Sequence, residues 1–212
     1  MKTVFIFLFC FSLCLAYSKS DLCNCIPKVG EKKPFRLTAK WETKGKDFPR
    51  AKKEIQPSSL YTWETKYSKF ADSSTVIWKT PRLTHTPEES LYTMKGWLWF
   101  VKKEKDCDFH IQIGRKNKGA FKRAVVELTV KQCSIQKELL DTLIARGYTI
   151  TQIDSGLELE KGIKVTVEGL GFYDWQHQLK EPAKNPPENS PLWKQEGTAW
   201  ELHPVINMAF EK

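Results

Sequence analysis

The chain has 212 residues and a formal net charge of +9. One uncharged hydrophobic run stands near its amino end and no second run follows, so the composition excludes a protein with several membrane spans. The absence of a G-x-S-x-G pattern and of a glycine-rich phosphate loop disfavours a serine nucleophile and a dinucleotide site.

Residues 1–18 have the pattern of a cleaved signal peptide. Lys2 precedes Thr3 to Ala16, a stretch of apolar and small residues without charge. A basic start, an apolar core and small residues near a cleavage point are typical of secretory signals. A membrane anchor would need about 20 apolar residues, and the run ends before that length. We therefore expect a secreted or periplasmic protein that begins near Lys19, has a charge of +8 and carries no transmembrane anchor.

Cleavage also changes the number of cysteines. Cys10 and Cys14 leave with the signal, and four of the six cysteines remain: Cys23, Cys25, Cys107 and Cys133. Four thiols outside the cytosol indicate disulfides, for which three pairings are possible. Zinc binding by Cys23-x-Cys25 is an alternative, although these cysteines lack the C-x-x-C spacing of zinc sites.

Residues 19–90 are predicted to form a basic N-terminal extension. Between Lys19 and Gln56 there are 11 Lys and Arg against 5 Asp and Glu. Such an arm could hold nucleic acid or another anionic polymer. The alternative is a solvated, lysine-rich segment that keeps the protein soluble. Apolar alternation in Phe35 to Trp41, and aromatic residues through Leu60 to Phe70, predict short strands that pack on the main body.

Residues 91–212 carry the clearest structural pattern, with three strands, a helix and two further strands. The expected helix includes Ile135 to Ile144, with Ser134 capping its start and Gly147 its end. The expected strands are Leu91 to Val101, Asp108 to Ile113, Phe121 to Val130, Gly162 to Leu170 and Trp200 to Phe210. This β-β-β-α-β-β order predicts an OB-fold-like five-stranded barrel. A split sheet with one packed helix is the alternative.

Two of the remaining cysteines flank a predicted hairpin. Cys107 lies just before the second strand and Cys133 just after the third. These ends are neighbours in an antiparallel hairpin, so we predict a disulfide between Cys107 and Cys133.

Acids and histidines alternate with apolar residues on the second, third and fifth strands. In an OB barrel these strands lie side by side, so the side chains that point away from the core would share one outer patch. OB-folds bind oligonucleotides or oligosaccharides on this face. The loop from Gly171 to Ala199 would add two polar residues to it. The candidate binding residues are Asp108, His110, Glu127, Asp174, His177, Glu201 and His203, of which Asp108, His110, Glu127 and His203 could hold a divalent metal.

Three segments resemble a family of small secreted bacterial proteins. They are Asp106 to His110, Gly169 to His177 and Glu201 to Val205, similar to the D-G-D-x-H, G-x-G-F-F-D-x-x-H and E-L-H-P-V motifs of that family. The resemblance spans about Leu91 to Met208, and Cys107 stands where the family has glycine. The resemblance supports the choice of candidate binding residues, but it implies no particular reaction or ligand.

Three functions remain open from the sequence. The first is a secreted OB-fold-like protein that binds nucleic acid or another polyanion. The second is a metal-dependent hydrolase of the nuclease or phosphodiesterase kind, because carboxylates and imidazoles can hold an ion that activates water. In the third, the patch is structural: Glu201 and Glu127 hydrogen-bond His203 and His110 and pin the long loop to the barrel.

Overall fold

The structure is a computed structural model, and it describes residues 52–67, 83, 85–117, 123–174 and 198–211. The predicted signal peptide and most of the basic arm therefore lie outside the described residues.

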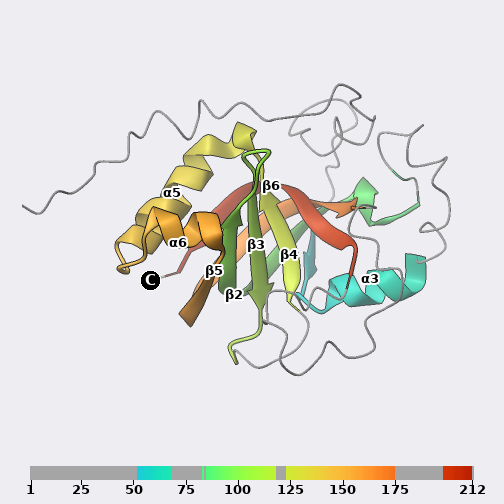
Figure 1. The fold of residues 1–212 in the computed structure, drawn as a ribbon. Helices are drawn as coiled ribbons and strands as arrows, with labels where there is room; N and C mark the ends of the chain where they lie inside the picture. The colour runs from blue at the N-terminus through green and yellow to red at the C-terminus, as the bar shows by residue number, and fades with distance from the viewer. Residues whose placement is uncertain (1–51, 68–82, 84, 118–122, 175–197, 212) are drawn as a thin grey trace, which may run out of the picture.

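Five strands close into a barrel, which confirms the predicted OB-fold-like architecture (Figure 1). The order around the barrel is β2-β3-β4-β6-β5, and β5 pairs with β2 to close it. Neighbouring strands are antiparallel except for β4 and β6, which run parallel. The strands are β2 (Leu91–Lys103), β3 (Phe109–Gly114), β4 (Ala124–Leu128), β5 (Leu157–Tyr173) and β6 (Trp200–Phe210).

Strand β2 closes the barrel because it is long enough to pair with two strands, β3 and β5. It pairs with β5 between Leu91 and Val101, and with β3 between Trp97 and Lys103. The register shifts on both sides between Leu98 and Phe100. Such irregularities bend a strand and raise its twist, as closure of a small barrel requires.

The strand boundaries differ from the sequence expectation mainly in β5. This strand begins at Leu157 and not at Gly162, because the alternation of buried and more exposed residues already starts at Leu157 and Leu159. Strand β4 ends at Leu128, and the chain turns at once into a short 3-10 helix, η3 (Val130–Gln132).

The N-terminal extension packs a strand and a helix against the barrel, besides the 3-10 turn at Pro87–Glu89. Strand β1 (Lys52–Ile55) runs parallel to β2 and pairs with it between Leu91 and Met94. Helix α3 (Ser59–Tyr67) follows, so the expectation of a strand over Leu60 to Phe70 is wrong for its described part. The other expected strand, Phe35 to Trp41, lies outside the described residues.

Helix α3 forms because its apolar residues recur at helical spacing. Leu60 is fully buried, and Trp63 and Tyr67, three and seven residues on, pack against the core. The Trp63 ring lies 4.7 Å from that of Tyr92 and 5.9 Å from that of Trp200. These contacts attach α3 beside the start of β6.

On the other side of the barrel from α3 lie α5 (Cys133–Ile144) and α6 (Ile150–Ser155), as Figure 1 shows. Helix α5 confirms the predicted helix, and Gly147 follows its end with φ of +89°. Ser134 does not cap it, since the helix already begins at Cys133. The sequence analysis did not foresee α6, a short helix that Thr149 caps.

The core fills the barrel and the spaces beneath the helices. Leu139 and Leu143 of α5 and Ile153 of α6 are at most 1% exposed. None of the helices that the structure describes combines the length and the apolarity needed to cross a membrane.

Candidate acid–histidine site

Three neighbouring strands bring the predicted acids and histidines together. Residue His110 of β3 pairs directly with Glu127 of β4, and Val125 of β4 pairs with Glu201 of β6. Side chains two residues apart on a strand share a face. Glu127 is two residues after Val125 and His203 is two residues after Glu201, so the side chains of Glu127, Glu201 and His203 lie on the same side of the sheet. We call the resulting group the acid–histidine cluster: Asp108, His110, Glu127, Asp174, Glu201 and His203.

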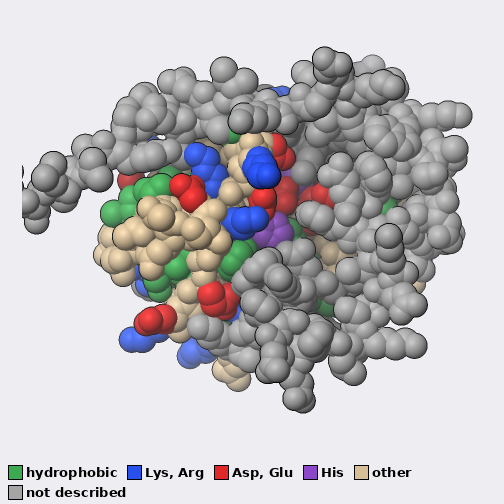
Figure 2. Space-filling view, viewed as in Figure 1, with side chains coloured by type: hydrophobic (Ala, Val, Ile, Leu, Met, Phe, Trp, Pro, Cys, Tyr) green, Lys and Arg blue, Asp and Glu red, His purple; other side chains and the backbone are tan. Residues whose placement is uncertain are grey.

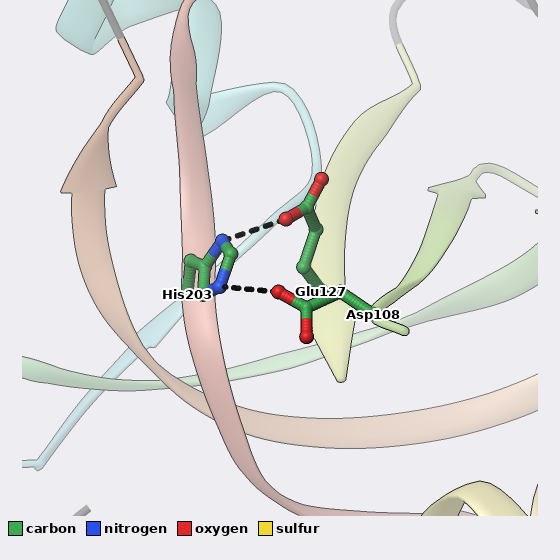
Figure 3. A group of neighbouring side chains, drawn as sticks. All are labelled: Asp108, Glu127 and His203. Carbon is green, nitrogen blue, oxygen red and sulfur yellow. Dashed lines mark ion pairs between the residues drawn. The ribbon is translucent and has the colours of Figure 1, made fainter. Parts of the chain in front are cut away.

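The imidazole of His203 stands at the centre of the cluster. Its Nδ1 lies 2.8 Å from Glu201 Oε1 and 2.8 Å from Glu127 Oε2. Its Nε2 lies 3.6 Å from Asp108 Oδ2. Figure 3 shows the carboxylates of Asp108 and Glu127 on the same side of the ring, each facing a different nitrogen. One histidine is therefore in contact with three carboxylates.

Glu127 connects the two histidines of the cluster. Its Oε2 contacts His203, and its Oε1 lies 3.3 Å from Nδ1 of His110. Glu127 is 3% exposed and His110 6%. The contacts predicted for a structural patch, Glu127 with His110 and Glu201 with His203, are therefore present.

Asp108 lies just before β3, and among the described residues only one of its two carboxylate oxygens is held by a hydrogen bond. Its Oδ1 accepts a hydrogen bond from the backbone N–H of Val130 at 3.2 Å. Its Oδ2 is buried, faces His203 and accepts no hydrogen bond within the part of the chain that the structure describes. A buried acceptor that faces a potential ligand nitrogen is where a cation would be stabilised.

The cluster is buried, which corrects the expectation of an outer binding patch. Each of its six members is at most 6% exposed. The burial patterns of β3 and β4 are continuous, so both faces of these strands are covered. In the space-filling view, acidic and histidine atoms reach the surface near the middle of one face, beside Lys and Arg side chains (Figure 2).

Burial and like charge shift the ionisation of Glu201. Loss of solvation raises the pKa of Glu201 to about 7, and the nearby charge of Glu127 adds to the rise. The hydrogen bond and charge of His203 oppose this shift, whereas Asp174 adds a smaller increase. The raised pKa of Glu201 reflects a buried cluster with four carboxyl groups and only two histidines.

The turn before Asp108 adopts an unusual backbone conformation. Cys107 has φ of +75°, in the left-handed region that favours glycine. Gln136 of α5 donates hydrogen bonds from Nε2 to the carbonyls of Cys107 at 3.1 Å and Leu128 at 2.9 Å. The first turn of α5, which begins at Cys133, is thereby tied to the backbone beside Asp108. The sequence analysis missed Gln136, whose signal is a polar residue on the apolar face of α5.

The end of β5 is held against a 3-10 turn, η2 (Pro87–Glu89). Gly171 is needed there because an added Cβ would lie 2.5 Å from the carbonyl oxygen of Pro87. The buried Glu88 accepts hydrogen bonds from the backbone N–H groups of Tyr173 and Leu83. These contacts fix the strand end that carries Asp174, whose own N–H donates to the carbonyl of Ala199 at 2.8 Å.

The remaining candidate, His177, and the tip of its loop lie outside the described residues. The structure thus brings six of the seven predicted site residues together and leaves His177 undescribed.

Comparison with known proteins adds no relative. No family model matches the chain, and no curated protein matches it either. The resemblance to small secreted bacterial proteins stays a prediction, although the left-handed conformation of Cys107 is one that glycine would adopt without strain.

Proposed function

We propose that this chain is an exported OB-fold-like binding protein whose acid–histidine cluster holds a divalent cation. The observation that carries the proposal is that Asp108, Glu127 and His203 each offer a ligand atom, and that these atoms lie within 4.8 Å of one another in a buried place. Carboxylate oxygens and imidazole nitrogens are common metal ligands.

The charge of the cluster favours a cation over a polyanion. Four of its members are carboxylic acids and two are histidines. A buried excess of negative charge is costly unless a cation or protons compensate it. Phosphate groups would add to the negative charge. A polyanion would therefore bind elsewhere, and the basic arm of Lys19 to Gln56 stays the candidate for it.

Binding also fits the burial of the cluster better than hydrolysis does. A bound polymer must bring its scissile bond to the ion, whereas Asp108 and His203 are at most 1% exposed. A single ion can reach buried side chains through a much smaller opening than a polymer can.

A purely structural cluster is the competing explanation. Hydrogen bonds between His110 and Glu127 and between His203 and Glu201 use Nδ1 of each histidine. They leave the Oδ2 atom of Asp108 without a hydrogen bond from the described residues. A cation at this oxygen would compensate that cost, so cation binding and not the hydrogen bonds alone is what must be tested.

The test is thermal unfolding of the mature protein after chelation, with Mg²⁺, Ca²⁺, Mn²⁺ and Zn²⁺ added singly. An ion at about 100 times its Kd should stabilise the fold by about 2.7 kcal/mol, which raises Tm by roughly 5 to 10 °C. Asp108→Asn should remove the rise, whereas Asp154→Asn, on the exposed side of α6, should keep it. The proposal fails if none of the four ions raises Tm and metal analysis of the untreated protein finds none.

A further inference from the structure

The cation site of the proposed function can be assigned to a class of ion and to particular atoms. We propose that it takes a first-row transition ion of the zinc type, through Asp108 Oδ2, His203 Nε2 and a carboxylate oxygen of Glu127, with Glu201 as a positioning residue. This assignment rests on the proposed function and makes it more specific.

The types of ligand atom favour such an ion. Mg²⁺ and Ca²⁺ prefer sites made of oxygen atoms. Imidazole nitrogen suits Zn²⁺ and other transition ions, which also accept carboxylates. The carboxylates of Asp108 and Glu127 lie on the same side of the His203 ring, and one ligand atom of each residue lies within 4.8 Å of the others, so an ion bound by both acids is also close to a ring nitrogen.

The orientation of the ring selects Nε2 as the ligand atom. Nδ1 of His203 lies 2.8 Å from Glu201 Oε1 and 2.8 Å from Glu127 Oε2, so this nitrogen is in the position to donate its proton to a glutamate, and we assign that role to Glu201. Histidines that bind metals commonly donate the other ring N–H to a carboxylate, which fixes the ring and makes it more basic. Glu201 can therefore act through His203 without touching the ion.

The separation of the two principal ligand atoms is close to that of a bound pair. Ligands about 2.0 to 2.2 Å from a tetrahedral Zn²⁺ lie about 3.4 Å from each other. Asp108 Oδ2 and His203 Nε2 are 3.6 Å apart. The ligand atoms of the trio lie within 4.8 Å of one another, and Glu127, whose Oε2 lies 2.8 Å from Nδ1 of His203, has to turn towards Nε2 to complete the set.

Asp108 supplies an observation independent of the acidic character of the site. Its side chain is 1% exposed, and Val130 holds its Oδ1 in place through a backbone N–H. Its Oδ2 is directed at His203 and receives no hydrogen bond from any described residue. An oriented, buried carboxylate oxygen without a proton donor is suited to a metal ion.

The experiment measures affinity on the mature, chelator-treated protein by competition with a chromophoric chelator and by calorimetry. Cys23→Ser and Cys25→Ser are introduced throughout, so that these thiols cannot bind the ion. We expect one Zn²⁺ per chain, bound at least 100-fold more tightly than Mg²⁺ or Ca²⁺. Co²⁺ in place of Zn²⁺ should show the visible absorption of a site with a nitrogen ligand.

Isosteric variants then test the assigned atoms. Asp108→Asn should weaken Zn²⁺ binding by more than 100-fold, and Glu201→Gln by 10- to 100-fold while the Co²⁺ spectrum is retained in shifted form. Glu160→Gln, exposed on β5, is the matched control and should bind as the parent does. Circular dichroism of each variant verifies that it is folded.

The outcomes separate this inference from the proposed function. Tight binding of Mg²⁺ or Ca²⁺ that Asp108→Asn abolishes, with weak binding of Zn²⁺, would overturn the assignment and keep the cation site. Zn²⁺ binding that Glu201→Gln leaves unchanged would remove Glu201 from its positioning role. Binding of no ion would overturn both.

Discussion

Glu201 shows how the barrel changes the chemistry of a single side chain. It is 2% exposed, and burial together with the charge of Glu127 raises its pKa to about 7. An acid whose pKa is higher in the folded than in the unfolded chain binds more protons when folded. Its ionisation therefore opposes folding as the pH rises from about 4.5 to about 7.

We expect the metal-free protein to lose stability across this pH range. The full shift of Glu201 corresponds to about 3 kcal/mol, present below its unfolded pKa and lost as the pH rises through 7. Glu201→Gln should remove this part of the pH dependence. The measurement is urea denaturation at several pH values in the presence of a chelator.

The control for this prediction is Glu160→Gln, which should follow the wild-type pH profile because Glu160 is exposed on the same sheet. If Glu201→Gln loses stability between pH 5 and 7 as steeply as the wild type, the pKa of Glu201 is not the cause.

At the scale of elements, periodicity predicted some features well and others poorly. Alternation placed Asp108 and His110 on the same side of β3, and the register of β3 with β4 confirms that Glu127 lies across from His110. Alternation does not say whether the polar side of a strand meets solvent. That depends on what packs over it, so the burial of the cluster could not be predicted.

Helix α3 shows that the type of element can also be predicted wrongly from the sequence. Aromatic residues are common in strands, which suggested a strand here. The spacing of Leu60, Trp63 and Tyr67 also fits one face of a helix, and packing against Trp200 of β6 decides between the two. A short apolar segment is ambiguous until its tertiary partner is known.

The start of β3 and the start of α5 are the elements that the predicted disulfide would join. Gln136 already ties α5 to the carbonyl of Cys107, one helical turn from Cys133. We expect peptides from the unreduced protein to contain Cys107 linked to Cys133 when analysed by mass spectrometry. Reduction, or Cys133→Ser, should then cost about 3 kcal/mol of unfolding free energy.

Ser134→Ala is the matched control for that prediction, since Ser134 is the exposed neighbour of Cys133 on α5 and should change stability little. Alkylation of Cys107 and Cys133 in the unreduced, folded protein would contradict the disulfide.

For the whole molecule, the order of strands and helix along the chain was enough to predict the barrel. That order leaves few ways to arrange five strands around one core, and the structure has the expected one. The parallel pairing of β1 with β2 was beyond prediction, because four residues with three charges carry little pattern.

The export proposal also concerns the whole molecule. We expect N-terminal sequencing of the exported protein to begin near Lys19, since Thr3 to Ala16 have the uncharged, apolar composition of a signal core. A charge in that core, Leu8→Asp, should block processing. Ile26→Asp, beyond the expected cleavage point, should leave it intact. An exported protein that retains Met1 would contradict the signal peptide.

The parallel pairing of β4 with β6 makes the cluster depend on the order in which the molecule assembles. Glu201 and His203 come from β6, whereas Asp108 and Glu127 lie far earlier in the chain. The imidazole of His203 meets Asp108 and Glu127 only after β6 has docked between β4 and β5. An ion held by both sets of residues would therefore bind the closed barrel in preference to an open one, and closure and ion binding would stabilise each other.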